Sequence, residues 1–227
     1  MLAFFAGLVK NRVLLKRMER NMHKLACGLI LLSALGTYAY ADAPPSGRIT
    51  IDLVTVNGSG CPKGTAVESS ADNTSIIVSY SDYLAQAGVG ANPTDFRKNC
   101  QLNVLVHVPQ GFSFAIAQAT YSGFASLASG ASALQRANYY FAGQTPTTVV
   151  SHALTGPFED DWMNTDSADV ATLVWSPCGV SRNLNINTEL RVLNGTSSAS
   201  ATNWIAMDTT HANVQNVFNF AWKRCTQ

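Results

Sequence analysis

The sequence predicts an all-β protein, an antiparallel β-sandwich of which the jelly roll is one form, with two disulfides. Apolar side chains alternate with polar ones in many short stretches, which is the period of a half-buried strand. Turn-forming residues separate these stretches at roughly regular intervals. Helical periodicity is weak, and only 13% of the residues are charged, as is usual for a turn-rich secreted sheet protein.

The first half of the chain holds four stretches that predict strands. Residues 48–56 and 75–83 alternate apolar and polar positions and are rich in β-branched side chains. Residues 100–109 place Leu and Val at every second position. A turn of three residues then leads into 112–127, so these last two stretches are expected to form a hairpin.

The second half completes a set of about nine predicted strands. The further stretches are 137–143, 147–156, 169–176, 184–195 and 216–225. The best helix candidate is 125–137, although a glycine near its centre weakens that prediction. We expect the strands to form two packed antiparallel layers.

The first 41 residues are expected to be a secretory signal peptide. Their apolar stretch is followed by Ala39 and Ala41, small residues at the positions that signal peptidase reads. The stretch is too short to span a bilayer. Cleavage after Ala41 would leave one secreted domain, 42–227, without a stable membrane span. The region before the apolar stretch is long, so Met22 is an alternative start, and an uncleaved anchor is the competing interpretation.

The cysteines predict two disulfides. Cleavage would remove Cys27 and leave Cys61, Cys100, Cys178 and Cys225, an even number in an exported chain. Three connectivities are possible, and we favour Cys61–Cys100 with Cys178–Cys225 because nested or crossed pairings need longer closures. Each bridge would contribute about 4 kcal/mol in the chain-entropy model. The spacing contains no C-x-x-C pair and therefore predicts no metal site.

Turn-forming residues surround the first of these cysteines in the sequence GSGCPKGT, 58–65. Asn57-Gly58 and Pro62-Lys63-Gly64 are both typical of turns. We expect them to end a strand and to set the direction of Cys61. A phosphate-binding loop is not indicated, because Lys63 is followed by glycine and by no helical pattern.

Charge and motifs exclude several functions. Residues 42–227 contain nine Lys and Arg against thirteen Asp and Glu, so this part of the chain has no electrostatic basis for binding nucleic acid. The G-x-S-x-G motif is absent. The three histidines of this region, His107, His152 and His211, are each isolated. The sequence therefore predicts no catalytic residue, metal ligand or cofactor.

Acidic and aromatic residues provide the remaining candidates. The acidic cluster Glu159–Asp161, with Asp166 and Asp169, is expected to be a solvated loop, and a calcium site is the less favoured alternative. Trp162 and Trp204 lie in polar surroundings and are the better candidates for exposed side chains that stack on a ligand, although full or partial burial is the default expectation for a tryptophan. The two other tryptophans, Trp175 and Trp222, lie beside cysteines and are expected in the core.

Several segments together resemble a known family. They are GSGCPKGT, RKNCQLNVLVHVPQGF, YSGFASLASG, WSPCG, LNINTELR and a closing WKRC. In this order they are similar to the small secreted proteins of fungi and bacteria grouped as domain of unknown function 4360. The resemblance runs from about Ile49 to Cys225. It implies a signal peptide, an all-β fold and four paired cysteines, and it implies no activity.

Three functions remain open. The favoured one is non-catalytic binding of an extracellular ligand, whether a glycan, a cell surface or a protein. The alternatives are a secreted hydrolase with dispersed active-site residues and a structural protein of the cell surface or matrix. The expected location is extracellular, or the periplasm or cell surface in a bacterium.

Overall fold

The structure is a computed structural model that describes residues 41–47, 49–61, 65–145, 149–168, 172–207 and 215–226. Residues 1–40, and with them nearly all of the expected signal peptide, lie outside the described residues. So do three kinds of residue named above: the turn formers Pro62, Lys63 and Gly64, the acidic residue Asp169, and the histidine His211.

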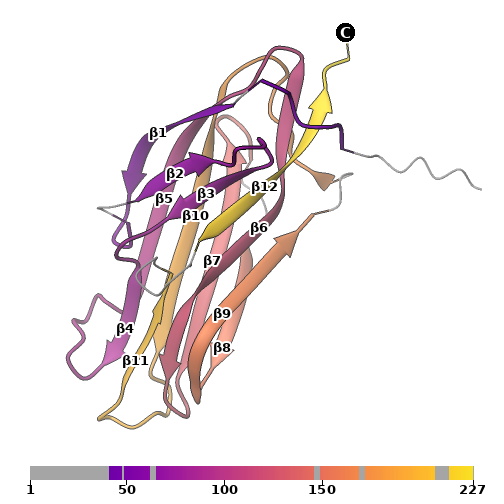
Figure 1. Ribbon diagram of the computed structural model, residues 1–227. Coiled ribbons are helices and arrows are strands. Elements are labelled where there is room, and N and C mark those ends of the chain that lie inside the picture. Colours follow the sequence, from indigo (N-terminus) through magenta and orange to yellow (C-terminus); the bar gives the residue numbers. More distant parts are fainter. Residues whose placement is uncertain are drawn as a thin grey trace, which may run out of the picture. The chain divides into compact units, whose positions relative to one another are not determined.

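Twelve strands in the described residues pair antiparallel throughout and form two sheets (Figure 1). The five-stranded sheet has the order β1 (Thr50–Asn57), β5 (Arg97–His107), β10 (Arg182–Leu193), β7 (Ser132–Phe141) and β8 (Val150–Thr155). The seven-stranded sheet has the order β2 (Ala66–Ser69), β3 (Ser75–Ser79), β12 (Asn216–Arg224), β6 (Phe112–Leu127), β11 (Thr202–Ala206) and β4 (Leu84–Gly88). Its seventh strand, β9 (Phe158–Ser167), pairs with the other side of β6.

The inward side chains of both sheets form one apolar core. In β5 the buried residues are Cys100, Leu102, Val104 and Val106, which occupy every second position, and their outward neighbours are polar or half-buried. The same alternation runs along β10 and β6. This pattern is what a strand shows when one face packs against a second sheet. The predicted all-β antiparallel sandwich with two disulfides is confirmed.

Several predicted elements differ in the structure. The helix candidate 125–137 is a hairpin, in which the end of β6 turns back into β7. Its alternating small and apolar residues fit a strand because each second one, such as Ala133, is buried. The acidic stretch expected as a loop is the strand β9. The described part of the predicted strand 169–176 contains no strand.

Asn73 holds the segment that precedes β1 against the seven-stranded sheet. It lies in the turn between β2 and β3, has φ 60°, and is 5% exposed. Its Oδ1 accepts the N–H of Ile49 (3.1 Å), and its Nδ2 donates to the carbonyls of Pro45 (3.1 Å) and Gly47 (2.8 Å). Its own carbonyl accepts from Trp222 Nε1 (3.0 Å). One side chain therefore satisfies three backbone groups that the sheets leave unpaired.

Candidate functional site

A polar hollow of about 350 Å³ lies on the outward face of the five-stranded sheet, and we call it the amide hollow. It is lined by strands β5, β10 and β7 and by Val149, which precedes β8. The side chains that give it its character are Arg97, Asn99, Gln101, Arg136, Asn138, Asn187 and Glu189. Amides and guanidinium groups therefore dominate its surface.

The sequence places amides on this face because strand positions alternate. In residues 100–106 of β5 and 184–192 of β10 the inward positions are apolar or small, and the outward ones are mostly Asn, Gln, Arg or Glu. Antiparallel pairing then sets the outward residues opposite one another in rows. One row joins Gln101, Asn187 and Asn138 across three strands. The whole face carries eight amide side chains: Asn57, Asn99, Gln101, Asn103, Asn138, Asn183, Asn185 and Asn187.

Part of this amide array has no internal partner. Asn103 accepts from Asn183 and donates to Asn185 Oδ1 (2.8 Å), so these three satisfy one another. Gln101 is exposed and Asn138 is half-buried, and within the part of the chain that the structure describes neither side chain has a protein hydrogen-bond partner. Asn187 Oδ1 is buried there without a partner. Buried polar atoms are normally paired, so the buried Asn187 Oδ1 marks a place for a polar ligand, and the solvent-facing amides of Gln101 and Asn138 lie beside it.

Charged residues form one end of the amide hollow. Glu189 accepts from Arg97 Nε (2.8 Å) and Nη2, and from Arg191 Nη2 (2.7 Å). Arg136 Nη1 lies 3.8 Å from Glu189 Oε1. Arg97 and Arg191 are directly opposite in the pairing of β5 with β10, where like charges repel. Glu189 offsets this repulsion, and its side chain is 12% exposed.

The arginines also set the protonation of Glu189. Its partial burial would raise the pKa of the carboxyl, but hydrogen bonds and charge from Arg97 and Arg191 outweigh this and hold the pKa below its usual value. The carboxylate of Glu189 is therefore ionised at any physiological pH.

A second carboxyl, that of Asp72 in the turn between β2 and β3, also has a lowered pKa. Hydrogen bonds from Ser70 and Thr74 lower this pKa to about 2.

We expect the protein to lose stability as the pH falls below about 4. The pKa values of Glu189 and Asp72 are lower in the folded chain than in the unfolded one. Their stabilisation is therefore complete above the unfolded pKa and is lost as the pH falls through the folded pKa. Melting temperatures recorded from about pH 6 to about pH 2 check this. Glu189→Gln should show a smaller fall, and a melting temperature independent of pH would contradict the expectation.

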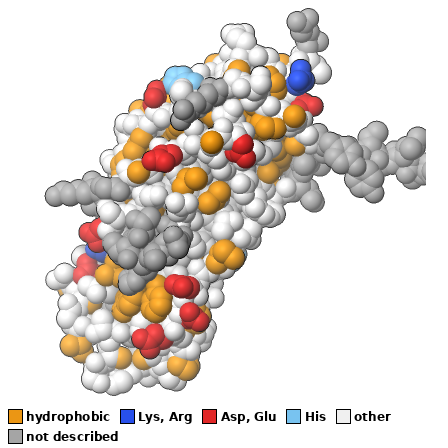
Figure 2. Space-filling view, in the orientation of Figure 1, with side chains coloured by type: hydrophobic (Ala, Val, Ile, Leu, Met, Phe, Trp, Pro, Cys, Tyr) orange, Lys and Arg blue, Asp and Glu red, His pale blue; other side chains and the backbone are white. Residues whose placement is uncertain are grey.

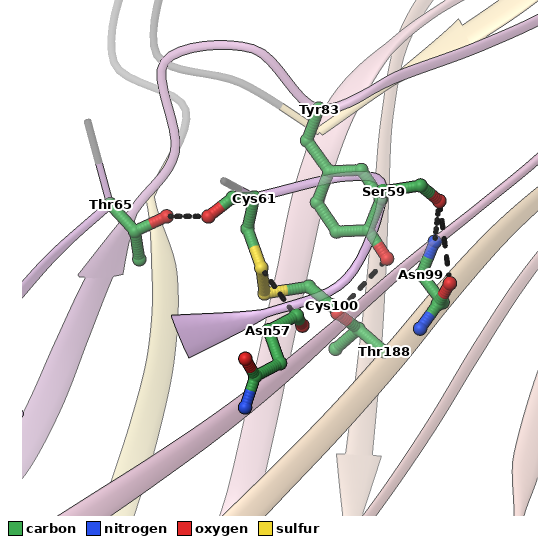
Figure 3. Close-up of a disulfide and its surroundings, with 8 residues drawn as sticks. All are labelled: Asn57, Ser59, Cys61, Thr65, Tyr83, Asn99, Cys100 and Thr188. Atoms are coloured by element: carbon green, nitrogen blue, oxygen red, sulfur yellow. Dashed lines mark hydrogen bonds between the residues drawn. A yellow bond between two sulfur atoms is a disulfide. The ribbon is translucent and has the colours of Figure 1, made fainter. Parts of the chain in front are cut away.

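A disulfide lies at the amide hollow, because one of its cysteines lines the hollow. Figure 3 shows this disulfide and its surroundings. Cys100 lines the hollow between Asn99 and Gln101, and it is bonded to Cys61, with the two Cα atoms 5.4 Å apart. The second disulfide joins Cys178 and Cys225. The structure thus contains the sequential pairing that we favoured from the sequence.

The glycines before Cys61 allow the close approach that this disulfide needs. Gly58 has φ 129°, and a Cβ there would lie 2.1 Å from the carbonyl oxygen of Asn99. A Cβ on Gly60 would lie 2.2 Å from the ring of Tyr83, and the Gly60 N–H donates to the same Asn99 carbonyl (2.9 Å). Figure 3 shows this turn beside the Tyr83 ring, whose hydroxyl pairs with Thr188 Oγ1 (3.2 Å).

The two tryptophans proposed as ligand-stacking residues have different surroundings. Trp162 is 6% exposed and belongs to the core, so the default expectation of burial holds for it and it is not an exposed stacking residue. It occupies an inward position of β9 opposite Gly123, which leaves space for its ring. Trp204 is half-buried on the outward face of the seven-stranded sheet and stacks on Phe124, with ring centroids 5.4 Å apart and planes at 24°.

The surroundings of Trp204 are mixed in character. Figure 2, which looks onto the seven-stranded sheet, shows hydrophobic and acidic side chains among neutral ones. In the pairing of β6 with β9, Asp161 is opposite Phe124 and Glu159 is opposite Ser126. A second hollow of about 500 Å³ includes Ser126 and Glu159. Trp204 does not line this hollow but is opposite Ser126 in the pairing of β11 with β6, so it stays a candidate for ligand contact on the outward face of the seven-stranded sheet.

The histidines and the acidic cluster do not converge on a metal site among the described residues. His152 Nε2 lies 2.6 Å from Asp166 Oδ1, and this pair links β8 of one sheet to β9 of the other. His107 pairs with Asp52 at the surface (2.7 Å). The described part of the chain also contains no helix that is long and apolar enough to cross a membrane.

Sequence reasoning missed the amide hollow, although a signal for it was present. The stretches 99–106 and 183–192 show mostly polar residues at every second position, alternating with a largely apolar face. That pattern marks a solvated sheet face. Which rows face each other depends on the register, which alternation within one strand does not reveal.

A β-sandwich with two disulfides and a polar hollow facing solvent defines this chain as a disulfide-stabilised extracellular β protein. The chain belongs to the family described as domain of unknown function (DUF4360), whose model matches residues 47–225. An uncharacterized secreted protein of Arthroderma benhamiae is 36% identical over 186 residues, which is 82% of this chain and 75% of that protein. The protein is secreted, as this relative and the two disulfides indicate.

Similarity to solved structures is slight. The enzymatically active domain of tailspike protein 4 from bacteriophage CBA120 has a TM-score of 0.24 and 12% identity, over 78% of this chain and 19% of that one. A family 11 carbohydrate-binding module of a Clostridium thermocellum cellulosomal cellulase has a TM-score of 0.21 and 10% identity, over 79% and 92%. Backbone similarity at this level carries no functional argument.

Proposed function

We propose that this secreted protein binds carbohydrate outside the cell and that the amide hollow is its binding site. The observation that carries the proposal is the row of Gln101, Asn138 and Asn187, whose side chains face one hollow without internal partners. An amide both donates and accepts hydrogen bonds, which matches the paired capacities of sugar hydroxyls. The volume of about 350 Å³ also lies in the range of small-ligand sites.

The lining of the hollow suits binding better than hydrolysis. Glycoside hydrolysis by the usual route needs two carboxyl groups on opposite sides of the scissile bond. Among the described lining residues the hollow has one carboxyl group, Glu189, and arginines hold it ionised. The lining strands belong to a sheet clamped by Cys61–Cys100, so the amides are held in place before a ligand arrives.

We also propose that the mature chain begins at Asp42, after removal of the signal peptide. The backbone N–H of Asp42 donates to the carbonyl of Trp222 (2.8 Å), and Asp42 Oδ2 accepts from the N–H of Arg224 (2.6 Å). These contacts support the proposal because they would hold the new terminus against β12.

The double variant Gln101→Ala/Asn138→Ala tests the site. Loss of two hydrogen bonds to ligand, at about 1 kcal/mol each, should weaken binding by about tenfold or more. Both side chains lie outside the core, so the melting temperature should change little. Binding is measured by titration calorimetry with polysaccharides that the wild-type protein retains in a pull-down panel of neutral and acidic chains.

Trp204→Ala is the matched comparison for this experiment, because it removes the aromatic pair on the other sheet. If Trp204→Ala abolishes binding and the double variant does not, the second surface is the site and the amide hollow is not. If no polysaccharide in the panel is retained by the wild-type protein, carbohydrate binding itself is refuted.

A further inference from the structure

Arg97 and Arg136 line one end of the amide hollow, and together with the neighbouring Arg191 they carry more positive charge than the one carboxylate between them neutralises. Arg97, Arg136 and Arg191 surround the single carboxylate of Glu189. Arginine stays protonated at all accessible pH values, so the cluster has a net charge of +2. Among the described residues, Glu189 is the sole acidic residue that forms an ion pair with these arginines. This positive end belongs to a region, 42–227, whose net charge is −4.

The geometry also leaves guanidinium donors available. Each guanidinium has five N–H donors, and the two oxygens of one carboxylate cannot accept from all fifteen. Arg136 is the most loosely held, at 3.8 Å from Glu189 Oε1, and its side chain is 36% exposed. Arg191 Nε is buried without a hydrogen-bond partner in the described part of the chain.

We propose that the amide hollow binds an anionic glycan, in which hydroxyls lie over the amide row and an acid group lies against Arg136. This inference rests on the proposed carbohydrate-binding function and names the class of sugar. Arg136 is opposite Glu189 in the pairing of β7 with β10, and the adjacent row holds Asn138 and Asn187. Successive outward side chains of a strand lie about 7 Å apart, so one acidic monosaccharide unit of a glycan can contact both rows.

Two kinds of acid group fit this chemistry. A guanidinium can donate two parallel hydrogen bonds to two oxygens of one acid group. The carboxylate of a uronic acid and a sulfate ester can both accept them. The shared requirement is an anionic oxygen group on a hydroxylated ring, and the experiment separates the two sources.

The first arm compares polysaccharides that differ in charge and share a backbone. Polygalacturonate is compared with its methyl-esterified form, and dextran sulfate with dextran, by calorimetry with the wild-type protein. We expect the charged member of at least one pair to bind about tenfold more tightly than its neutral counterpart. Preference within the first pair alone identifies a carboxylate, and preference within the second pair alone identifies a sulfate.

The second arm locates that preference. Arg136→Gln should reduce the ratio of charged to neutral affinity about tenfold and should flatten the dependence of affinity on salt. Arg182→Gln is the matched control, because it removes the same charge from an exposed residue at the start of β10, outside the lining of the hollow. The Arg182→Gln variant should keep the wild-type ratio of charged to neutral affinity.

The outcomes distinguish failure of the anionic preference from failure of carbohydrate binding. Equal binding of charged and neutral chains overturns the anionic preference and leaves carbohydrate binding standing. If Arg182→Gln reduces the preference for charged chains as much as Arg136→Gln does, the attraction is unspecific. That result also overturns the proposed anionic site. If none of these chains and no chain of the wider panel binds, carbohydrate binding is refuted and the anionic preference falls with it.

Discussion

Replacing Cys61 and Cys100 together by alanine is expected to lower the free energy of unfolding by about 4 kcal/mol, because the bridge closes a loop of 39 residues. The two side chains are 2% and 1% exposed, and alanine introduces no polar atom into this buried site. In a chain of this size the melting temperature should fall by about 10 °C. Denaturant titration and thermal melting of the secreted protein measure both quantities.

This disulfide variant should also affect binding. Cys100 lies in the floor of the amide hollow between Asn99 and Gln101, so loss of the clamp loosens the amide row as well as the fold. The control is Cys178→Ala/Cys225→Ala, which opens a loop of 47 residues away from the hollow. It should lose similar stability, and while folded it should keep its affinity for polysaccharide. Equal loss of affinity in both variants would contradict a local role for Cys61–Cys100.

Replacing Asn73 by alanine is expected to lower the free energy of unfolding by about 3 kcal/mol. The change leaves the N–H of Ile49 and the carbonyls of Pro45 and Gly47 without their partner. Each unpaired buried group costs about 1–3 kcal/mol, and detachment of the segment into water limits the total. Alanine also tolerates the φ of 60° less well than asparagine does.

Asn73→Gly separates the two effects of that change. Glycine lacks the same side chain but adopts a positive φ without strain. The free energy of unfolding of Asn73→Gly should therefore exceed that of Asn73→Ala by about 1 kcal/mol. Limited proteolysis should cut both variants in residues 41–47 faster than the wild type. Stability within about 0.5 kcal/mol of the wild type for both variants would refute the anchoring role of Asn73.

The strands that could be predicted are those whose own residues carry the pattern. β5, β6 and β12 combine alternation with large apolar side chains on the inward face, and each was expected close to its observed place. β2, β4 and β11 are four or five residues long and were not predicted. Such short strands are defined mainly by the neighbour with which they pair, and that neighbour is distant in sequence.

Trp162 shows how local composition can mislead. Its neighbours Asp160, Asp161 and Asn164 are polar, which suggested an exposed loop. In β9 the outward positions are Glu159, Asp161 and Met163, while Trp162 faces inward. The positions in phase with Trp162 in this strand, such as Asp160 and Asn164, are also polar, so alternation alone does not reveal its burial, which follows from the pairing of β9 with β6.

The amino-acid sequence by itself indicated the all-β class, the secreted location and the four cysteines that form disulfides, because alternation, composition and cysteine spacing are local or additive properties. Tertiary structure decided where function can reside. The row of Gln101, Asn187 and Asn138 and the arginines around Glu189 come from strands far apart in the chain. Register across strands is set by the packing of the whole sandwich, and only that packing brings these polar side chains to one hollow.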